Sequence, residues 1–248
     1  MQAVVPLFAG FAIPVTATEA VQTIKRYLDE LSRAYEHTDR DVNLELTGGD
    51  GSHFMLGVVH QDRLAVMLTR LLDSEQFLSP HGIRSMSKYH RDHPYTYRVS
   101  GRDHVVDYAP AESRNRMFGG NSNWRGPVWL PTNFLFVQAL NSYARFLGDT
   151  VSVPDPADPT GTASLASIGD RMARRLTGLL VRDDHGRRAT FGDNEYFQND
   201  PHWRDLVPFS EYFDGDTGRG LGASHQTGWT ATVALLLQFR GKLHFDRR

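Results

Sequence analysis

The residues from Phe118 to Asn133, FGGNSNWRGPVWLPTN, combine tryptophans with side chains that donate hydrogen bonds. Trp124 and Trp129 lie on either side of Arg125, and Asn121 precedes them. A buried helix or strand needs apolar positions at a regular period, which this stretch lacks. Flat apolar rings beside amide and guanidinium donors suit the binding of a ring that carries many hydroxyl groups. The stretch therefore predicts one wall of a carbohydrate site.

Two later stretches have a similar mixture of aromatic, charged and glycine residues. The first, QNDPHWRD, runs from Gln198 to Asp205 and contains Trp203, and the second runs from Phe209 to Trp229. A tryptophan is usually a core residue, but the four tryptophans of this chain all lie in glycine-rich or charged motifs. We therefore expect at least two of them to stack on a sugar.

Glu211 is the candidate catalytic residue of the second stretch. Pro208 prevents a helix from running through the sequence FSEYF, and in an extended segment Phe209, Glu211 and Phe213 point to one side. A carboxylate between aromatic side chains is suited to proton transfer. A surface glutamate on an edge strand explains the same pattern, so the spacing alone leaves both interpretations open.

Other chemistries have weaker support. Asp214 and Asp216 resemble the start of a calcium loop, but Arg219 stands where that loop requires glycine, so a tight turn is the favoured interpretation. His225 has no second histidine at the spacing of a metal site and is expected to be a hydrogen-bonded wall residue. The sequence has no cysteine, no GxSxG elbow and no phosphate loop with its lysine. We expect neither a metal nor a cofactor.

Five segments have the periodicity of helices that would position these motifs, and they begin near Thr18, Gln61, Pro131, Leu165 and Thr227. The helix from Pro131 is apolar on most sides, which indicates an interior helix, whereas others have a single apolar face. Residues 149–163 contain three prolines and are expected to be an exposed excursion. Residues 86–117 are compatible with strand pairs or with long loops. The pattern predicts a mainly α fold and suits a toroid of about twelve helices, of which this chain supplies about half.

The composition is that of a globular protein. Of 248 residues, 40% are hydrophobic and 23% are charged, and the net charge is -2. A surface that binds nucleic acid usually has a concentrated basic excess, so we expect no nucleic-acid partner. No apolar run reaches the length of a membrane span, and the apolar first residues follow no basic region, so we expect a cytoplasmic protein without membrane contact. An uncapped apolar beginning also suggests that the chain starts inside a domain.

Three motifs, GGNSNWRGPVWLPTNFL, QNDPHWRD and EYFDGDTGRGLGASHQTGW, resemble those of the catalytic domain of glycoside hydrolase family 63. The similarity is to the bacterial branch, close to mannosyl-oligosaccharide glucosidases and to mannosylglycerate and glucosylglycerate hydrolases. VVPLFAGF, FLSPHGIRSMSKYH and VDYAPAES resemble that branch in the same order. The resemblance therefore covers nearly the whole chain.

This resemblance implies that residues 1–248 are the C-terminal part of an (α/α)6 barrel, a mainly α toroid with long loops and short strands. It implies an inverting hydrolase of α-glucosides or α-mannosides, in which an acid and a base stand roughly 6.5–9.5 Å apart to admit a water molecule. By motif position Glu211 is the general base. The residues around the nonreducing sugar are then Trp124, Arg125, Trp129, Gln226 and Trp229.

The general acid of the family is an aspartate in the N-terminal half of the barrel, and this sequence has no match to its motif. Loss of such an acid typically lowers the rate about 10²–10⁴-fold. The chain by itself is therefore expected to be nearly inactive, and to be oligomeric or poorly soluble. Its expected partners are a carbohydrate substrate and either a chain with the other half of the barrel or further copies of itself. The alternative is a non-catalytic carbohydrate-binding or scaffold half, or an inactive remnant.

Overall fold

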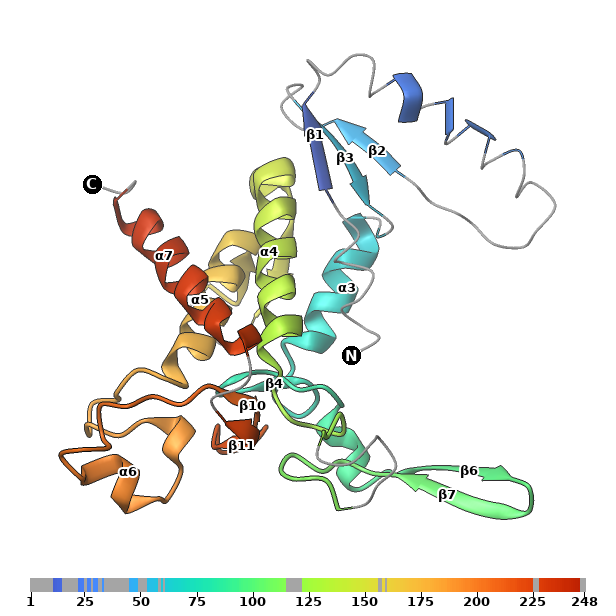
Figure 1. The fold of residues 1–248 in the computed structure, drawn as a ribbon. Coiled ribbons are helices and arrows are strands. Elements are labelled where there is room, and N and C mark those ends of the chain that lie inside the picture. Colours follow the sequence, from blue (N-terminus) through green and yellow to red (C-terminus); the bar gives the residue numbers. More distant parts are fainter. Residues whose placement is uncertain are drawn as a thin grey trace. The chain divides into compact units, whose positions relative to one another are not determined.

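The computed structural model of the protein describes residues 11–14, 22–24, 26–27, 29–30, 33, 45–48, 53–57, 59, 61–114, 122–155, 158, 160–224 and 228–245. The chain divides into two compact units (Figure 1). The first consists mainly of Arg70–Leu135 and Asp170–Arg248, and the second of Gln2–Thr69 and Phe136–Gly169. Every described residue that the sequence predicts to form the site belongs to the first unit.

Four helices confirm the periodicity of the sequence. They are α3 (Gln61–Leu71), α4 (Leu130–Leu147), α5 (Leu165–Gly178) and α7 (Thr232–Phe245). Proline is the second residue of α4, where its missing N–H leaves no helical bond unmade. On α5 the buried residues recur at three- and four-residue spacing. The start of α7 is later than predicted because Gly228–Ala231 forms a 3-10 turn. Much of the helix expected from Thr18 lies outside the described residues, and Gln22 to Ile24 within it are helical.

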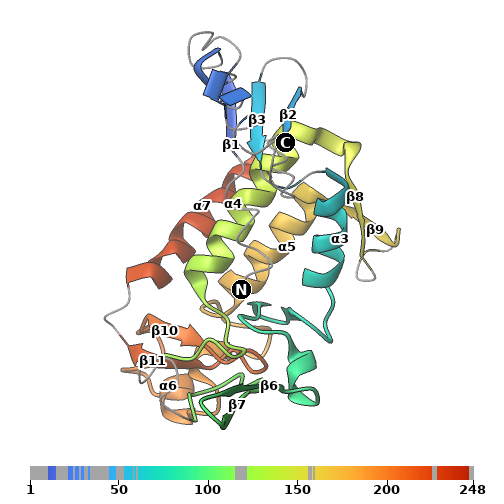
Figure 2. The same ribbon diagram turned by 90° about the vertical axis from the view of Figure 1, so that its right-hand side faces the viewer.

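The second unit contains a three-stranded antiparallel sheet in the order β1-β3-β2 (Figure 2). Its strands are β1 (Phe11–Pro14), β2 (Glu45–Gly48) and β3 (His53–Gly57). β2 and β3 pair with Glu45 opposite Gly57 and Gly48 opposite Phe54. β2 and β3 are therefore the two strands of a hairpin.

Residues 149–163 are exposed at Ser152, Pro154 and 160–162, as predicted, but the segment also forms a strand pair with buried side chains. It contains the paired strands β8 (Ser152–Pro154) and β9 (Thr162–Ser164), with Val153 opposite Ala163. Val151 and Val153 are buried. The prolines in this segment did not exclude strands, because a proline at the end of a short strand removes no necessary hydrogen bond.

In the first unit the tryptophan-rich central stretch, of which residues 122–133 are described, forms β-bridges with two other segments. Val128 forms antiparallel bridges with Arg84 and with Phe213. Arg84 directly follows the hairpin of β4 (Leu78–Ser79) and β5 (Gly82–Ile83), and Phe213 ends β10 (Ser210–Phe213), which pairs with β11 (Gly220–Ser224). Asn133 fixes the same junction, since its side chain accepts from the N–H of Ile83 at 2.7 Å and donates to the carbonyl of Ile83 at 3.0 Å.

Residues 86–117, for which the sequence left strands and loops open, contain a hairpin. β6 (Tyr95–Val99) pairs with β7 (Arg102–Val106) over five residues of each strand. Figure 1 shows this hairpin extending away from the other elements of its unit, and the residues of β6 are all exposed. A turn of Ser100 and Gly101, both with positive φ, joins the strands, as is usual for a two-residue hairpin loop.

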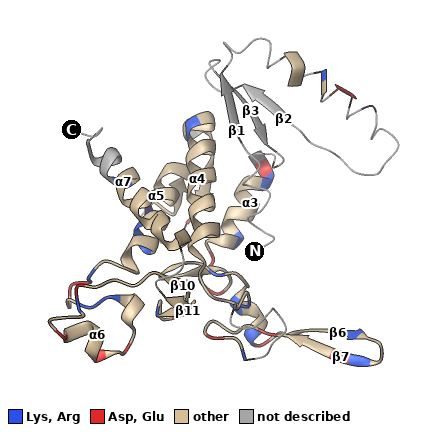
Figure 3. Ribbon diagram, viewed as in Figure 1, with Lys and Arg blue, Asp and Glu red and all other residues tan. Residues whose placement is uncertain are grey.

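The described residues form a mainly α fold with short strands, as predicted, and the arrangement in a ring stays a prediction. Acidic and basic residues are interspersed along the described segments, for example around α6 (Glu195–Asn199) (Figure 3). None of the described helices is both long enough and apolar enough to cross a membrane.

Candidate functional site

Three aromatic rings form a stack at the centre of the first unit. The ring of Trp129 lies parallel to that of Trp124, with 4.0 Å between the ring centres, and its other face contacts Tyr212 at 4.9 Å. Trp229, from the 3-10 turn before α7, crosses Trp129 at 5.9 Å and 58°. Trp129 is only 2% exposed, and its Nε1 donates to the carbonyl of Asn123 at 2.9 Å. The predicted wall residues Trp124, Trp129 and Trp229 are therefore brought together.

The tryptophans differ in the faces that a ligand could reach. Both faces of Trp129 are covered by neighbouring rings, so this residue supports the stack from inside. Trp124 is half-buried and Trp229 is exposed. The apolar ring surface open to solvent therefore belongs to Trp124 and Trp229, which composition alone could not distinguish from Trp129.

Glu211 lies on β10, beside this stack. Its Oε1 accepts from Ser122 Oγ at 2.9 Å, and its Oε2 accepts from the N–H of Ala223 on β11 at 3.1 Å. The carbonyl of Glu211 accepts from Trp229 Nε1 at 2.9 Å. Glu211 thus connects the central stretch, the β10–β11 hairpin and the exposed tryptophan. Sequence reasoning did not identify Ser122, because an isolated serine next to two asparagines carries no spacing signal.

The order of side chains along β10 differs from the expected alternation. Phe209, Glu211 and Phe213 were predicted to share one side, but Ser210, Tyr212 and Phe213 are buried and Glu211 is half-buried. The register of the hairpin shifts between Ser210 and Tyr212. This irregularity allows both Tyr212 and Phe213 to be buried, and it breaks the period of two on which the prediction depended.

Arg125 is 1% exposed, deeper than expected for a residue that contacts substrate. Its Nη1 donates to Asp107 Oδ1 at 2.7 Å, and Asp107 also accepts from Arg114 at 2.7 Å. The buried Nε and Nη2 groups of Arg125 have no hydrogen-bond partner in the part of the chain that the structure describes. Unpaired donors of a buried charged group are unfavourable, so this guanidinium retains the capacity to bind another acceptor.

Trp203 lies apart from the stack. Among the described aromatic rings, it contacts Tyr196 at 6.0 Å and Phe197 at 5.6 Å, both on α6. The remaining predicted wall residues, Asn121, His225 and Gln226, lie outside the described residues. Their placement in the site stays a prediction.

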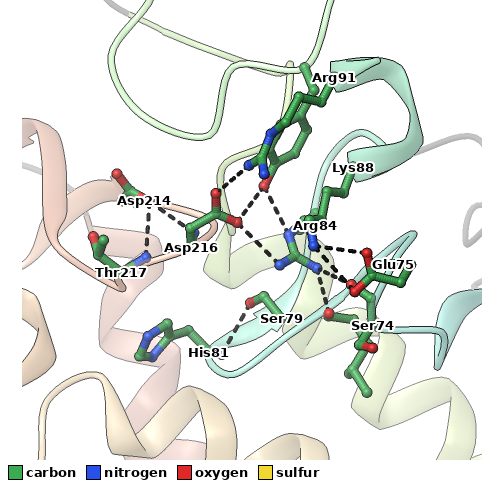
Figure 4. A network of polar contacts seen from close by, with 12 residues as sticks. Ser74, Glu75, Ser79, His81, Arg84, Lys88, Arg91, Asp214, Asp216 and Thr217 are labelled. Atoms are coloured by element: carbon green, nitrogen blue, oxygen red, sulfur yellow. Dashed lines mark hydrogen bonds and ion pairs between the residues drawn. The ribbon is translucent and has the colours of Figure 1, made fainter. Parts of the chain in front are cut away.

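The sequence DGDTGRG forms the tight turn that was favoured over a calcium loop. Asp214 Oδ1 accepts from the N–H groups of Asp216 at 2.8 Å and of Thr217 at 3.0 Å (Figure 4). Asp216 in turn accepts from Arg84 at 3.2 Å and from Arg91 at 2.7 Å. The turn between β10 and β11 is therefore anchored to residues more than a hundred positions earlier in the chain.

Tyr108 completes this network. Its hydroxyl donates to Asp216 Oδ1 at 2.8 Å and accepts from Arg84 Nε at 2.9 Å. Burial raises the pKa of Tyr108, so the hydroxyl stays a donor. Burial also acts to raise the pKa of Asp216, but the hydrogen bonds from Tyr108 and Arg84 and the nearby arginine charges outweigh it and lower that pKa. Asp216 thus remains a carboxylate that holds the turn.

Comparison with known proteins gives the family of the chain. Residues 22–230 match the family model of the mannosylglycerate hydrolase MGH1-like glycoside hydrolase domain. The chain belongs to this family. The match confirms the glycoside hydrolase resemblance of the motifs, and within this MGH1-like domain it covers Ser122, Glu211 and Trp229.

Two relatives show how the MGH1-like domain compares with longer proteins. It is 44% identical over 233 residues to an uncharacterized protein of Saccharomyces cerevisiae, YMR196W, which covers 93% of this chain and 21% of that protein. It is 26% identical over 186 residues to a probable mannosyl-oligosaccharide glucosidase of Schizosaccharomyces pombe, which covers 74% of this chain and 16% of that protein. The chain thus spans about a fifth of the length of these relatives.

Proposed function

We propose that this MGH1-like domain carries the general base of an inverting glycosidase. The bond hydrolysed is an α-glucosidic or α-mannosidic bond of an oligosaccharide or of a glycosyl-glycerate. The observation that carries the proposal is the carboxylate of Glu211, fixed by Ser122 and Ala223 next to Trp229 in a glycoside hydrolase domain.

The fixed carboxylate suits the activation of water. Each oxygen of Glu211 accepts one hydrogen bond from the protein and keeps another lone pair for a water molecule. In the proposed step Glu211 takes a proton from water while the water oxygen bonds to the anomeric carbon. The bond from that carbon to the glycosidic oxygen breaks, and an acid protonates the departing oxygen. Trp124 and Trp229 offer the apolar faces on which the sugar ring would stack.

The acid has no counterpart among the motifs of this chain, and we assign it to another part of a complete barrel. The described helices are compatible with one half of such a barrel. Natural glycosides need the acid because an alkoxide is a poor leaving group, and its loss lowers rates about 10²–10⁴-fold. The chain alone is then a poor hydrolase of ordinary glycosides.

Glycosyl fluorides provide the test, because fluoride leaves without protonation by an acid. We expect the purified chain to hydrolyse α-D-glucosyl fluoride or α-D-mannosyl fluoride and to release the β-anomer first, as followed by proton NMR. Glu211→Gln should lower this rate about 10²–10⁴-fold and leave sugar binding intact. Glu75→Gln, at an exposed glutamate paired with Lys88, is the matched control.

Equal rates for the wild-type chain and Glu211→Gln would remove the residue from the role of base, and initial release of the α-anomer would exclude inversion. The alternative function is a carbohydrate-binding half that completes a barrel with another chain. It predicts sugar binding by the wild-type chain without hydrolysis of the fluorides that depends on Glu211.

A further inference from the structure

A hollow of about 410 Å³ lies next to the strand that carries Glu211 but does not include that residue. It is bounded by the 3-10 turn Ala189–Phe191, by α6 and by the β10–β11 hairpin. Figures 1 and 2 both show α6 close to this hairpin. Ser210 and Ser224, which face each other across the hairpin, line the hollow, whereas the carboxylate of Glu211 is turned to Ser122 and Ala223. The hollow is therefore separate from the proposed catalytic carboxylate.

The lining combines aromatic rings with hydroxyl groups. Phe191 and Phe197 lie nearly parallel, with 5.6 Å between their ring centres, and form an apolar side. Thr190, Ser210 and Ser224 supply hydroxyl groups that both donate and accept. Apolar rings with a few convergent polar groups are typical of a small-molecule pocket.

One of these hydroxyl groups lacks a partner. Thr190 is 6% exposed, and its buried Oγ1 has no hydrogen-bond partner among the described residues. Buried polar atoms in folded proteins are nearly always paired, so this hydroxyl beside the hollow retains the capacity for a further hydrogen bond. The residue belongs to a turn held by its own backbone, since the N–H of Thr190 donates to the carbonyl of Leu179 at 3.0 Å. The backbone at Thr190 is thus held in place before a ligand binds.

A second hollow, of about 660 Å³, adjoins the first. Both are lined by Asp193 and Arg219, so these two side chains stand at their common border. Among the described residues, neither Asp193 nor Arg219 has an ion-pair partner. The second hollow is also lined by Arg188, whose buried Nε has no hydrogen-bond partner within the described segments. Two adjoining hollows, each with an unpaired polar group, fit a ligand longer than a single ring.

The charges at the border select the class of ligand. A carboxylate and a guanidinium at the same place oppose a ligand with strong charge of either sign, because one of the two would repel it. Neighbouring hydroxyl groups of a neutral sugar can form hydrogen bonds with both side chains, because a hydroxyl group can donate to Asp193 and accept from Arg219. We propose that the two hollows form a binding site for a neutral oligosaccharide, distinct from the site at Glu211. The proposal rests on the carbohydrate class of the proposed function but not on catalysis by Glu211.

Calorimetric titration of the full chain with maltotriose and with α-mannotriose tests this site. We expect Asp193→Ala and Arg219→Ala each to weaken the binding of one of these sugars about tenfold or more, because each loses a hydrogen bond to a charged group. Thr190→Val, which keeps the shape of the side chain, should also weaken it. Asp92→Ala and Arg102→Ala, at exposed residues that line neither hollow, are the matched controls.

Two further variants separate this proposal from the proposed function. Glu211→Gln abolishes hydrolysis of the fluorides if the base is correctly assigned, and Trp229→Ala disturbs the aromatic stack, but both should bind the trisaccharide at this site as the wild type does. The proposal is overturned if neither trisaccharide binds at millimolar concentration. It is equally overturned if binding is lost in Trp229→Ala and kept in Asp193→Ala, which would place the sugar at Glu211. Circular dichroism of each variant establishes that it is folded.

Discussion

The carboxylate of Glu211 receives its two hydrogen bonds from different kinds of donor. The N–H of Ala223 belongs to the backbone of β11 and is retained whatever side chain stands there. The hydroxyl of Ser122 belongs to the central stretch and is removed by a single substitution. Ser122 is therefore the residue through which the orientation of the carboxylate can be changed without removing the carboxylate.

Ser122→Ala should lower kcat for hydrolysis of the glycosyl fluoride about tenfold or more and leave KM nearly unchanged. A hydrogen bond to a charged group contributes about 1.5–3 kcal/mol, and about 1.4 kcal/mol corresponds to a factor of ten in rate. Ser122→Thr retains the hydroxyl and should recover most of the rate. Steady-state kinetics of the three proteins measures this. If kcat falls as much in Ser122→Thr as in Ser122→Ala, packing at residue 122 and not the hydrogen bond to Glu211 is responsible.

His81, in the turn between β4 and β5, links stability to pH. Burial lowers the pKa of His81, and Arg175 and Arg84 lower it further, while Asp214 acts in the opposite direction. A histidine whose pKa is lower in the folded state than its ordinary 6.5 stabilises the fold fully above pH 6.5. This stabilisation is lost as the pH falls from 6.5 through the folded-state pKa, because the unfolded chain binds the proton more readily.

The free energy of unfolding should therefore be lower at pH 5.5 than at pH 7.5, and the difference should be smaller in His81→Gln. Urea unfolding of the wild type and the variant at both pH values measures it. His202→Gln, at an exposed histidine, is the control. An unchanged difference in His81→Gln would assign the pH dependence to other groups.

At the scale of the elements, β11 must approach β10 closely for Glu211 to be held. Gly222 has φ +69, and a Cβ there would lie 2.6 Å from Glu211 Oε2 and 2.8 Å from Tyr212. Gly101, in the turn between β6 and β7, has φ +75 and nothing within 4 Å of such a Cβ. The two glycines have the same kind of backbone conformation and differ in what surrounds them.

Alanine at these two glycines should separate backbone strain from displacement of the carboxylate. Gly101→Ala should destabilise by about 1–2 kcal/mol from the left-handed conformation alone and leave fluoride hydrolysis unchanged. Gly222→Ala should destabilise more and also lower the hydrolysis rate, because its methyl group displaces Glu211. Thermal unfolding and fluoride hydrolysis of both variants give the comparison. Full activity in Gly222→Ala would contradict a fixed carboxylate.

Elements with a local period could be predicted, and contacts between distant residues could not. The apolar periodicity of α3, α4 and α5 lies within the residues of each helix, so these helices could be predicted from the sequence. The bond between Arg84 and Asp216 joins residues 132 positions apart and has no local signal. Contacts within the site could not be predicted either. The motifs predicted the same sugar-binding role for Trp124 and Trp129, and only the packing in the structure shows that neighbouring rings cover both faces of Trp129.

At the scale of the whole chain, apolar residues remain exposed on the last helix. Leu235 is 50% exposed and Leu237 is 46% exposed on α7. Positions two apart on a helix point about 200° from each other, so these leucines lie on different sides of α7. Exposed leucines on two sides of one helix give α7 apolar surface through which chains can associate.

The isolated chain should therefore self-associate through α7. We expect its weight-average sedimentation coefficient to rise with concentration, and we expect the double variant Leu235→Lys, Leu237→Lys to reduce this rise, because charged side chains on both sides of the helix oppose burial of the surface. Val99→Lys with Val105→Lys is the matched control, since these residues of the β6–β7 hairpin are 50% and 46% exposed. An equal reduction by the control would assign the association to charge in general rather than to α7. A wild-type chain that stays monomeric at all concentrations would contradict an uncovered interface, and the chain would then be self-sufficient in folding whatever its catalytic state.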